Sequence, residues 1–325
     1  MAKTKLKKFR VAILRDFPSL IAAKFKLIGN GWDSAAVDVD RKLIFKFPRK
    51  KGARESLRRE AGILAIVRPA LSVTVPDLRL HEGPPLFSTH LKLKGRQLET
   101  EDYEGLPEAA RARLGKDLAR FYAELHGLDP ELMRSVGTGP IAPWHRPKAV
   151  RARALPLLPH KLVPLAKSVV DAYKALPSDP YGMIFGFFDG HGWNMAFDRK
   201  KQRLRGIYDF ADSGFGPLHQ DFIYADMISP DLTGRIVAAY ESLTDRALDR
   251  QRIDILTGYH HLSELADFSE DADLQKEFIR DFKIWGAAPR GFYGATPRRR
   301  SIKRLRRRPS VAYAEARNPP CPPLR

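Results

Sequence analysis

This sequence has a single cysteine and no long apolar run. Cys321 is its only cysteine, so no disulfide can form within the chain. Its apolar runs fall far short of the ~20 residues needed to cross a bilayer. The basic residues 1–10 are followed by a stretch that Arg15, Asp16 and Pro18 interrupt at once, which does not fit a signal peptide. We therefore expect a cytoplasmic protein with no membrane partner.

Positive charge is abundant, and most of it lies at the two ends of the chain. The formal net charge is +19 over 325 residues. Residues 298–325 contain ten Lys or Arg and one acid, a net +9, and residues 1–10 add five more cations. Only +5 is left for residues 11–297. The charge therefore predicts no specific nucleic-acid function for the core, only non-specific binding through the basic tail.

The first third of the chain predicts a small sheet with one helix. Strand patterns occupy residues 26–29, 34–39 and 43–47, and weaker ones lie at 79–80 and 86–93. A helical pattern covers residues 54–67. These elements predict an N-terminal lobe over residues 1–95.

From about residue 107 the pattern becomes mainly helical. Four apolar residues spaced four, three and four apart predict an amphipathic helix that ends at Gly127: Leu114, Leu118, Phe121 and Leu125. Further helices are expected over 162–176, 233–243, 248–266 and 274–285, a strand over 183–188, and a hairpin that pairs 195–197 with 204–209. Residues 140–160, rich in Pro and Arg, are expected to be a connection. We expect a C-terminal lobe over 96–293 and a disordered tail over 294–325.

The most informative short segment is Asp189-Gly190-His191-Gly192-Trp193-Asn194, with Asp209-Phe210 following at a strand end. Phosphoryl transfer needs a carboxylate near the attacking hydroxyl and hard oxygen ligands for Mg²⁺. Asp189 and Asn194 can divide these tasks on one tight loop, and Asp209 can complete the metal site. An ordinary Asp/Gly/Asn turn would also explain the loop alone.

Lys46 lies inside an apolar strand, where an unpaired charge is costly. Glu60, on the following helix, is its expected partner, and in kinases such a pair directs the lysine onto the α- and β-phosphates. The turn Gly29-Asn30-Gly31 can present backbone N–H groups to phosphate, although two such glycines also make an ordinary hairpin.

Taken in order, these motifs resemble the aminoglycoside phosphotransferase family, over residues 20–290. The similarity is greatest to its 2″-phosphotransferase branch. The segments that carry the resemblance are Ile28–Ser34, Ile44–Arg49, Arg59–Ala61, Leu118–Leu128 with His126, Asp189–Asn194, Ile207–Gly214 and Gln220–Tyr224.

The resemblance implies an α+β, bilobal, protein-kinase-like fold with ATP or GTP between the lobes. It implies Asp189 as the catalytic base, Asn194 and Asp209 as the Mg²⁺ ligands, and Lys46 with Glu60 as the pair that positions the phosphates. Gly29, Gly31 and Ser34 would form the nucleotide loop, and Asp221 would brace the catalytic loop.

One departure from the family pattern concerns the two residues before Asp189. The family usually has His-Gly or His-Asn there, and this chain has Phe187-Phe188. The departure keeps a non-catalytic nucleotide-binding protein open as an alternative to an active kinase.

The expected acceptor is a cationic small molecule, most simply an aminoglycoside-like aminated sugar. The sequence basis is an acidic stretch in the C-terminal helices: Glu264, Asp267, Glu270, Asp271 and Asp273. A solvated loop explains the same stretch, and kinases of choline, homoserine or similar metabolites stay open, because one fold serves many acceptors.

Overall fold

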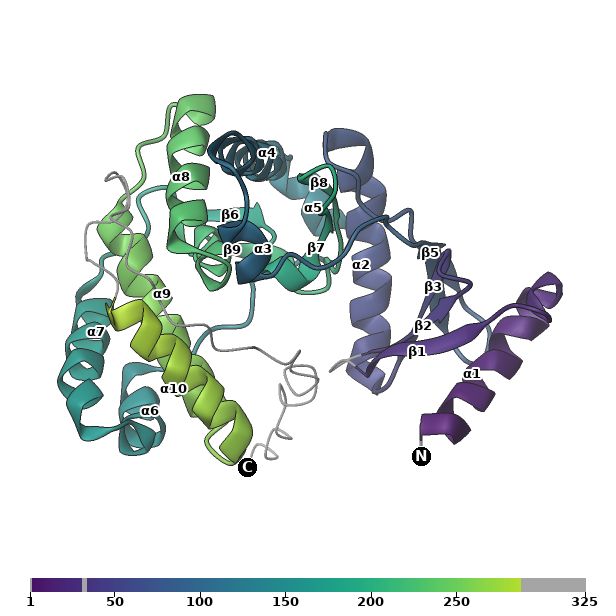
Figure 1. Ribbon diagram of the computed structural model, residues 1–325, viewed down its shortest axis with the longest axis horizontal. Helices are drawn as coiled ribbons and strands as arrows, with labels where there is room; N and C mark the ends of the chain where they lie inside the picture. Colours follow the sequence, from purple (N-terminus) through teal and green to yellow (C-terminus); the bar gives the residue numbers. More distant parts are fainter. Residues whose placement is uncertain (1, 31–33, 288–325) are drawn as a thin grey trace.

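The computed structural model describes residues 2–30 and 34–287 of the chain. A five-stranded antiparallel sheet in the order β1-β2-β3-β5-β4 forms the N-terminal lobe. Its strands are β1 (Phe25–Asn30), β2 (Ser34–Val39), β3 (Leu43–Pro48), β4 (Arg79–His81) and β5 (Phe87–Leu91). Figure 1 shows this sheet at one end of the molecule and a larger, mainly helical lobe at the other. The bilobal α+β fold expected from the sequence is confirmed.

Two helices pack on the N-terminal sheet. Alternating apolar residues of β2 and β3 point to the face that α1 (Ala2–Asp16) covers, where Phe9 stacks on Phe47 with ring centroids 4.4 Å apart and Ile13 is fully buried. The sequence analysis did not foresee α1. The predicted helix over 54–67 is confirmed as α2 (Lys51–Ala70), which lies between the sheet and the C-terminal lobe in Figure 1.

The core of the C-terminal lobe is built on the amphipathic helix α4 (Glu108–His126), which packs along α8 (Pro230–Thr244). All four residues of the predicted apolar stripe on α4 are buried, and Gly127 follows the helix as expected. The short helices α3 (Thr100–Glu104) and α5 (Pro130–Ser135) flank α4 in the chain.

Two small antiparallel sheets carry the loops of the candidate site. The strand β6 (Met183–Gly186) pairs with β9 (Gly214–Pro217), and β7 (Met195–Asp198) pairs with β8 (Arg203–Ile207) in the predicted hairpin. The strand expected over 183–188 ends two residues earlier, at Gly186. The reason is that the N–H groups of Phe187 and Phe188 donate to the carboxylate of Asp221 and Phe188 has a φ of 53°.

A second apolar cluster joins the four outer helices α6 (Pro147–Arg153), α7 (Val163–Ala175), α9 (Arg250–Asp267) and α10 (Ala272–Ala287). The expectation that 140–160 is only a connection is wrong, because α6 lies within it and buries Val150 completely. Short 3₁₀ turns complete the fold: η1 (Pro18–Leu20), η2 (Leu155–Leu157), η3 (His160–Leu162), η4 (Gly192–Asn194), η5 (Leu218–Phe222) and η6 (Tyr224–Met227). None of the helices described in 2–30 and 34–287 is long and apolar enough to span a membrane.

Candidate active site

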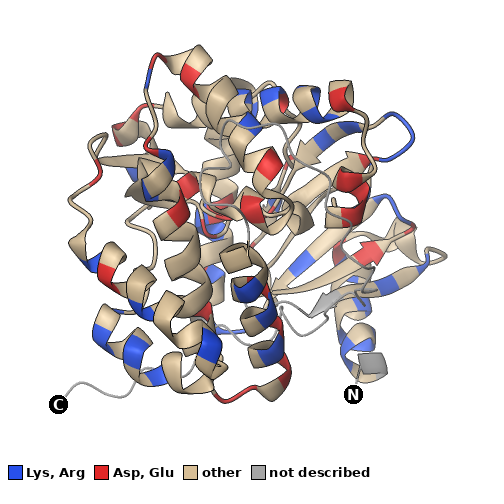
Figure 2. Ribbon diagram, turned by 60° about the vertical axis from the view of Figure 1, so that its left-hand side comes forward, with Lys and Arg blue, Asp and Glu red and all other residues tan. Residues whose placement is uncertain are grey.

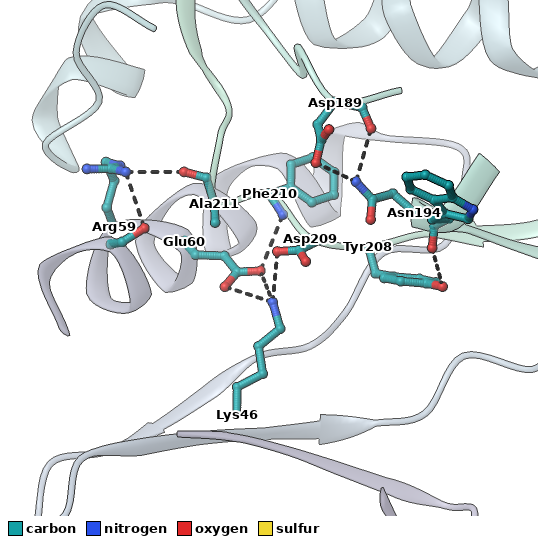
Figure 3. A network of polar contacts seen from close by, with 11 residues as sticks. Lys46, Arg59, Glu60, Asp189, Asn194, Tyr208, Asp209, Phe210 and Ala211 are labelled. Atoms are coloured by element: carbon teal, nitrogen blue, oxygen red, sulfur yellow. Dashed lines mark hydrogen bonds and ion pairs between the residues drawn. The ribbon is translucent and has the colours of Figure 1, made fainter. Parts of the chain in front are cut away.

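Lys46 of β3 lies between two carboxylates that come from distant parts of the chain. Its Nζ is 2.9 Å from Oε1 and 3.2 Å from Oε2 of Glu60, a buried residue of α2. The same Nζ is 3.0 Å from Oδ1 of Asp209, which follows β8 (Figure 3). The structure thus brings together the predicted Lys46–Glu60 pair and adds Asp209 to it.

Burial and charge act in opposite directions on this ionic network. Burial alone would lower the pKa of Lys46, but the charges of Asp209 and Glu60 outweigh it and raise the pKa above its ordinary value. Burial raises the pKa of Glu60, the ammonium of Lys46 opposes that rise, and the charge of Asp209 adds to it. Lys46 is therefore a fixed cation at neutral pH.

The loop between β6 and β7 is closed by hydrogen bonds to Asp189. Nδ2 of Asn194 donates to Oδ2 of Asp189 at 2.6 Å and to its backbone oxygen at 3.0 Å. Nε2 of His191 lies 2.9 Å from Oδ1 of Asp189. Asn194 and His191 thus contact different oxygens of the Asp189 carboxylate.

Two glycines allow this loop to pack as tightly as it does. A Cβ on Gly190 would lie 2.0 Å from the hydroxyl of Tyr122, and one on Gly192 would lie 1.9 Å from the backbone oxygen of Leu98. Any larger residue at either position would push the loop off α4 or off the segment after β5, so the sequence Asp-Gly-His-Gly is required by close approach.

Asn194 and Asp209 lie on adjacent segments, because the N–H of Tyr208 donates to the backbone oxygen of Asn194 at 3.0 Å. The amide nitrogen of Asn194 is used by Asp189 and one oxygen of Asp209 by Lys46. The remaining amide and carboxylate oxygens are hard donors of the kind that Mg²⁺ prefers. Within the described residues no cluster of three or more His, Cys, Asp or Glu forms a metal site. A two-residue set fits a Mg²⁺ whose other ligands are phosphate oxygens and water.

Asp221 braces the catalytic loop from behind. Its fully buried carboxylate accepts the N–H groups of Phe187 at 2.8 Å and of Phe188 at 2.5 Å. Nε2 of His126 lies 3.0 Å from Oδ2 of Asp221, and Nδ1 of His126 lies 2.9 Å from the hydroxyl of Tyr240. The bracing network of Asp221, His126 and Tyr240 thus ties α4, α8 and η5 to the two residues before Asp189.

The unusual Phe187-Phe188 pair fits this site. Phe187 is buried, with its ring centroid 4.9 Å from that of Phe210 and 5.5 Å from that of Phe121. Phe188 adopts a left-handed φ of 53°, a conformation that Gly and Asn reach at little cost. A Phe there stores on the order of 1–3 kcal/mol of strain, which its burial and the Asp221 hydrogen bond hold in place.

The proposed nucleotide loop is described in part. Gly29 lies in β1 opposite Ala36, and Ser34 begins β2 opposite Pro48. Gly31 lies outside the described residues.

The expected acidic stretch does not act as one surface. Glu264 is buried on α9, 3.6 Å from Nε2 of His260, and Asp267 contacts Nε2 of His145 at 2.7 Å. Oδ1 of Asp271 accepts the N–H groups of Asp273 and Leu274, so it caps α10.

Comparison with known proteins agrees with this geometry. The family model described as the phosphotransferase enzyme family matches residues 24–267, which is more than half of the chain. The chain belongs to this family. It is a small-molecule kinase, a phosphotransferase whose acceptor group is a hydroxyl.

Solved structures share the fold of this phosphotransferase. Wild-type aminoglycoside 2'-phosphotransferase-IIIa in complex with GDP superposes with a TM-score of 0.73 at 20% identity, covering 87% of this chain and 98% of that one. The streptomycin-ATP-APH(2")-IIa ternary complex gives a TM-score of 0.59 at 17% identity, covering 84% of this chain and 95% of that one. The apoenzyme of macrolide 2'-phosphotransferase MphH from Brachybacterium faecium gives a TM-score of 0.60 at 16% identity, covering 80% of this chain and 91% of that one.

Sequence reasoning missed two relationships between distant segments of this phosphotransferase. Arg59, next to Glu60, donates to the backbone oxygen of Ala211 at 3.1 Å and so ties α2 to the segment after Asp209. Asp226 of η6 lies near enough to Asp254 of α9 for their charges to interact. Burial, and then the charge of Asp254, raise the pKa of Asp226 to about 7. No local pattern predicts either relationship, because each joins segments far apart in the sequence.

Proposed function

We propose that the chain transfers the γ-phosphoryl group of ATP or GTP to a hydroxyl of a cationic small molecule, most simply an aminoglycoside-like aminated sugar. The observation that carries the proposal is the network in which Lys46 contacts both Glu60 and Asp209. A lysine fixed at this point would contact a triphosphate whose metal ion Asp209 would hold. GDP and ATP in the solved relatives support a nucleotide as co-substrate.

In this proposal Asp189 accepts the proton of the attacking hydroxyl. Its carboxylate is held by the hydrogen bond from Asn194 and contacts His191, so it needs no rearrangement before it meets the acceptor. Asn194 and Asp209 would hold Mg²⁺ through their remaining oxygens, and the ion would neutralise charge on the phosphates. Glu60 keeps Lys46 extended towards the phosphates, and Gly29, Gly31 and Ser34 contribute the loop over them.

The acceptor is proposed to be cationic because of the carboxylate pair Asp226–Asp254. An ammonium group near both carboxylates would relieve the repulsion that raises the pKa of Asp226. Nε1 of Trp285 donates to Oδ1 of Asp254 at 3.1 Å and fixes the direction of that carboxylate. Asp226 follows Asp221 by five residues, on the turn next to the one that braces the catalytic loop. Kanamycin and streptomycin in complexes of the solved relatives support the same class of acceptor.

Nucleotide consumption tests the proposal directly. Full-length protein with Mg²⁺ and either ATP or GTP is assayed with aminated sugars and with neutral sugars of the same size. We expect turnover with the aminated sugars, a KM that rises with salt, and a further rise of KM in Asp254→Asn. Equal turnover of charged and neutral acceptors would overturn the cationic class, and no turnover with any acceptor would favour a non-catalytic nucleotide-binding protein.

A further inference from the structure

Away from the candidate active site, one stretch of the core concentrates positive charge. Residues 146–174 contain seven Lys or Arg and one acid, a net +6, whereas residues 11–297 as a whole carry only +5. The rest of that range is therefore close to neutral. The cations are Arg146, Lys148, Arg151, Arg153, Lys161, Lys167 and Lys174, and the acid is Asp171.

Four of these cations line one groove between α6 and α7. The groove has a volume of about 680 Å³, and the charged residues that line it are Arg146, Lys148, Arg151, Lys174 and Asp171. The side chain of Arg151 forms an ion pair with Asp171, which is the only acid among the residues that line the groove. Figure 2 shows Lys and Arg gathered on the helices at the lower left of that view.

The other three cations are exposed and have no ion pair within the described residues: Arg146, Lys148 and Lys174. Packing fixes the spacing of the two helices that carry these cations. Helices α6 and α7 bury Val150 and Val170 in one apolar cluster, which also contains Tyr259 of α9. The groove thus carries three cations without an ion pair in the described part of the chain, on a rigid two-helix base.

The exposure and polarity of the residues that line the groove indicate which kind of partner it would bind. Its three unpaired cations are exposed, as is usual for contacts with a phosphate backbone, where many weak contacts replace a few buried ones. None of the large exposed apolar residues of the described chain lies within 146–174, so nothing here would enter a lipid layer. The two uncharged residues of the lining are Pro147 and Ala152, so the charged side chains supply its polar contacts.

We propose that the groove between α6 and α7 binds the phosphate backbone of a nucleic acid, independently of sequence. None of Lys46, Asp189 and Asp209 lines it, so binding there is separable from phosphoryl transfer. The basic segment 298–325 would add to the affinity through its own charge.

Fluorescence anisotropy with a short labelled single-stranded oligouridine tests the groove in the full-length protein. Arg146→Gln/Lys148→Gln/Lys174→Gln removes three charges there. Lys5→Gln/Lys7→Gln/Lys8→Gln removes three exposed charges from α1 as the matched control.

We expect the groove variant to raise Kd at least tenfold and the control variant to raise it less than threefold. Three lost phosphate contacts on a single strand should also reduce the slope of log K against log salt by about 2 between roughly 50 and 200 mM. Kinase turnover should be unchanged in both variants. Equal losses in the two variants would show that binding follows total charge and would overturn the proposal. So would a groove variant that loses affinity for vesicles of anionic lipid while keeping its affinity for RNA.

Discussion

His126 and Asp221 form a buried pair behind the catalytic loop, with Nε2 3.0 Å from Oδ2 and both side chains almost completely excluded from solvent. The same carboxylate receives the backbone N–H groups of Phe187 and Phe188. The position of Asp189 therefore depends on a contact between α4 and η5 that is closed to solvent.

Asp221→Asn is expected to destabilise the protein by roughly 2–4 kcal/mol. An amide cannot accept hydrogen bonds through both ends, so at least one of the two backbone N–H groups or His126 loses its partner. Urea unfolding measures the loss, and kcat should fall together with it because the loop before Asp189 is released. Glu131→Gln, at an exposed site, should change stability by less than about 0.5 kcal/mol. Comparable unfolding curves for the two variants would contradict the bracing role.

Asp209→Asn is expected to shift the Mg²⁺ dependence of turnover to higher concentration. The amide keeps the size of the side chain but loses the charge that attracts both the metal ion and Lys46. Activity measured against Mg²⁺ at saturating acceptor gives the shift. An unchanged titration would rule out Asp209 as a ligand.

Asp226 gives the stability of the protein a definite pH dependence. Its folded pKa is about 7, against an ordinary value of 3.8, because of burial and then the charge of Asp254. The folded protein therefore keeps a proton that the unfolded chain loses above pH 3.8, and the stability that this proton provides is lost as pH rises towards 7.

The substitution Asp226→Asn removes this loss of stability at rising pH, because an amide does not titrate. We expect the variant to exceed the parent in free energy of unfolding by roughly 1–3 kcal/mol at pH 8 and by much less at pH 5. It should also bind an aminated acceptor less well, as expected where a functional site reduces stability. Urea unfolding at both pH values is the measurement, and a difference that does not change with pH would contradict the assignment.

Much of the site could be predicted from local patterns. A lysine inside an apolar strand needs a partner of opposite charge, and this requirement predicted the pairing of Lys46 with Glu60. The loop from Asp189 to Asn194 holds its polar residues within six adjacent positions. The contact of Lys46 with Asp209, 163 residues apart, was not predicted, because no local pattern joins the two residues. The closeness of Asp226 and Asp254 depends on how η6 meets α9, and no local pattern encodes that.

Two helices were missed for different reasons. Residues 140–160 suggested a connection because they are rich in Pro, yet Pro147 stands at the first position of α6, where proline favours a helix start. Leu6, Phe9 and Ile13 form the apolar face of α1 at helical spacing, but four lysines within residues 3–8 mask that pattern in the sequence.

Single-turnover phosphoryl transfer by Asp189→Asn tests the central claim most directly, with nucleotide affinity measured on the same variant and Glu131→Gln as the control. A positioned base contributes typically ~10²–10⁴ in rate, so we expect a loss of that size with the nucleotide Kd nearly unchanged. A variant that phosphorylates the best acceptor at more than half of the parent rate would contradict Asp189 as the catalytic base.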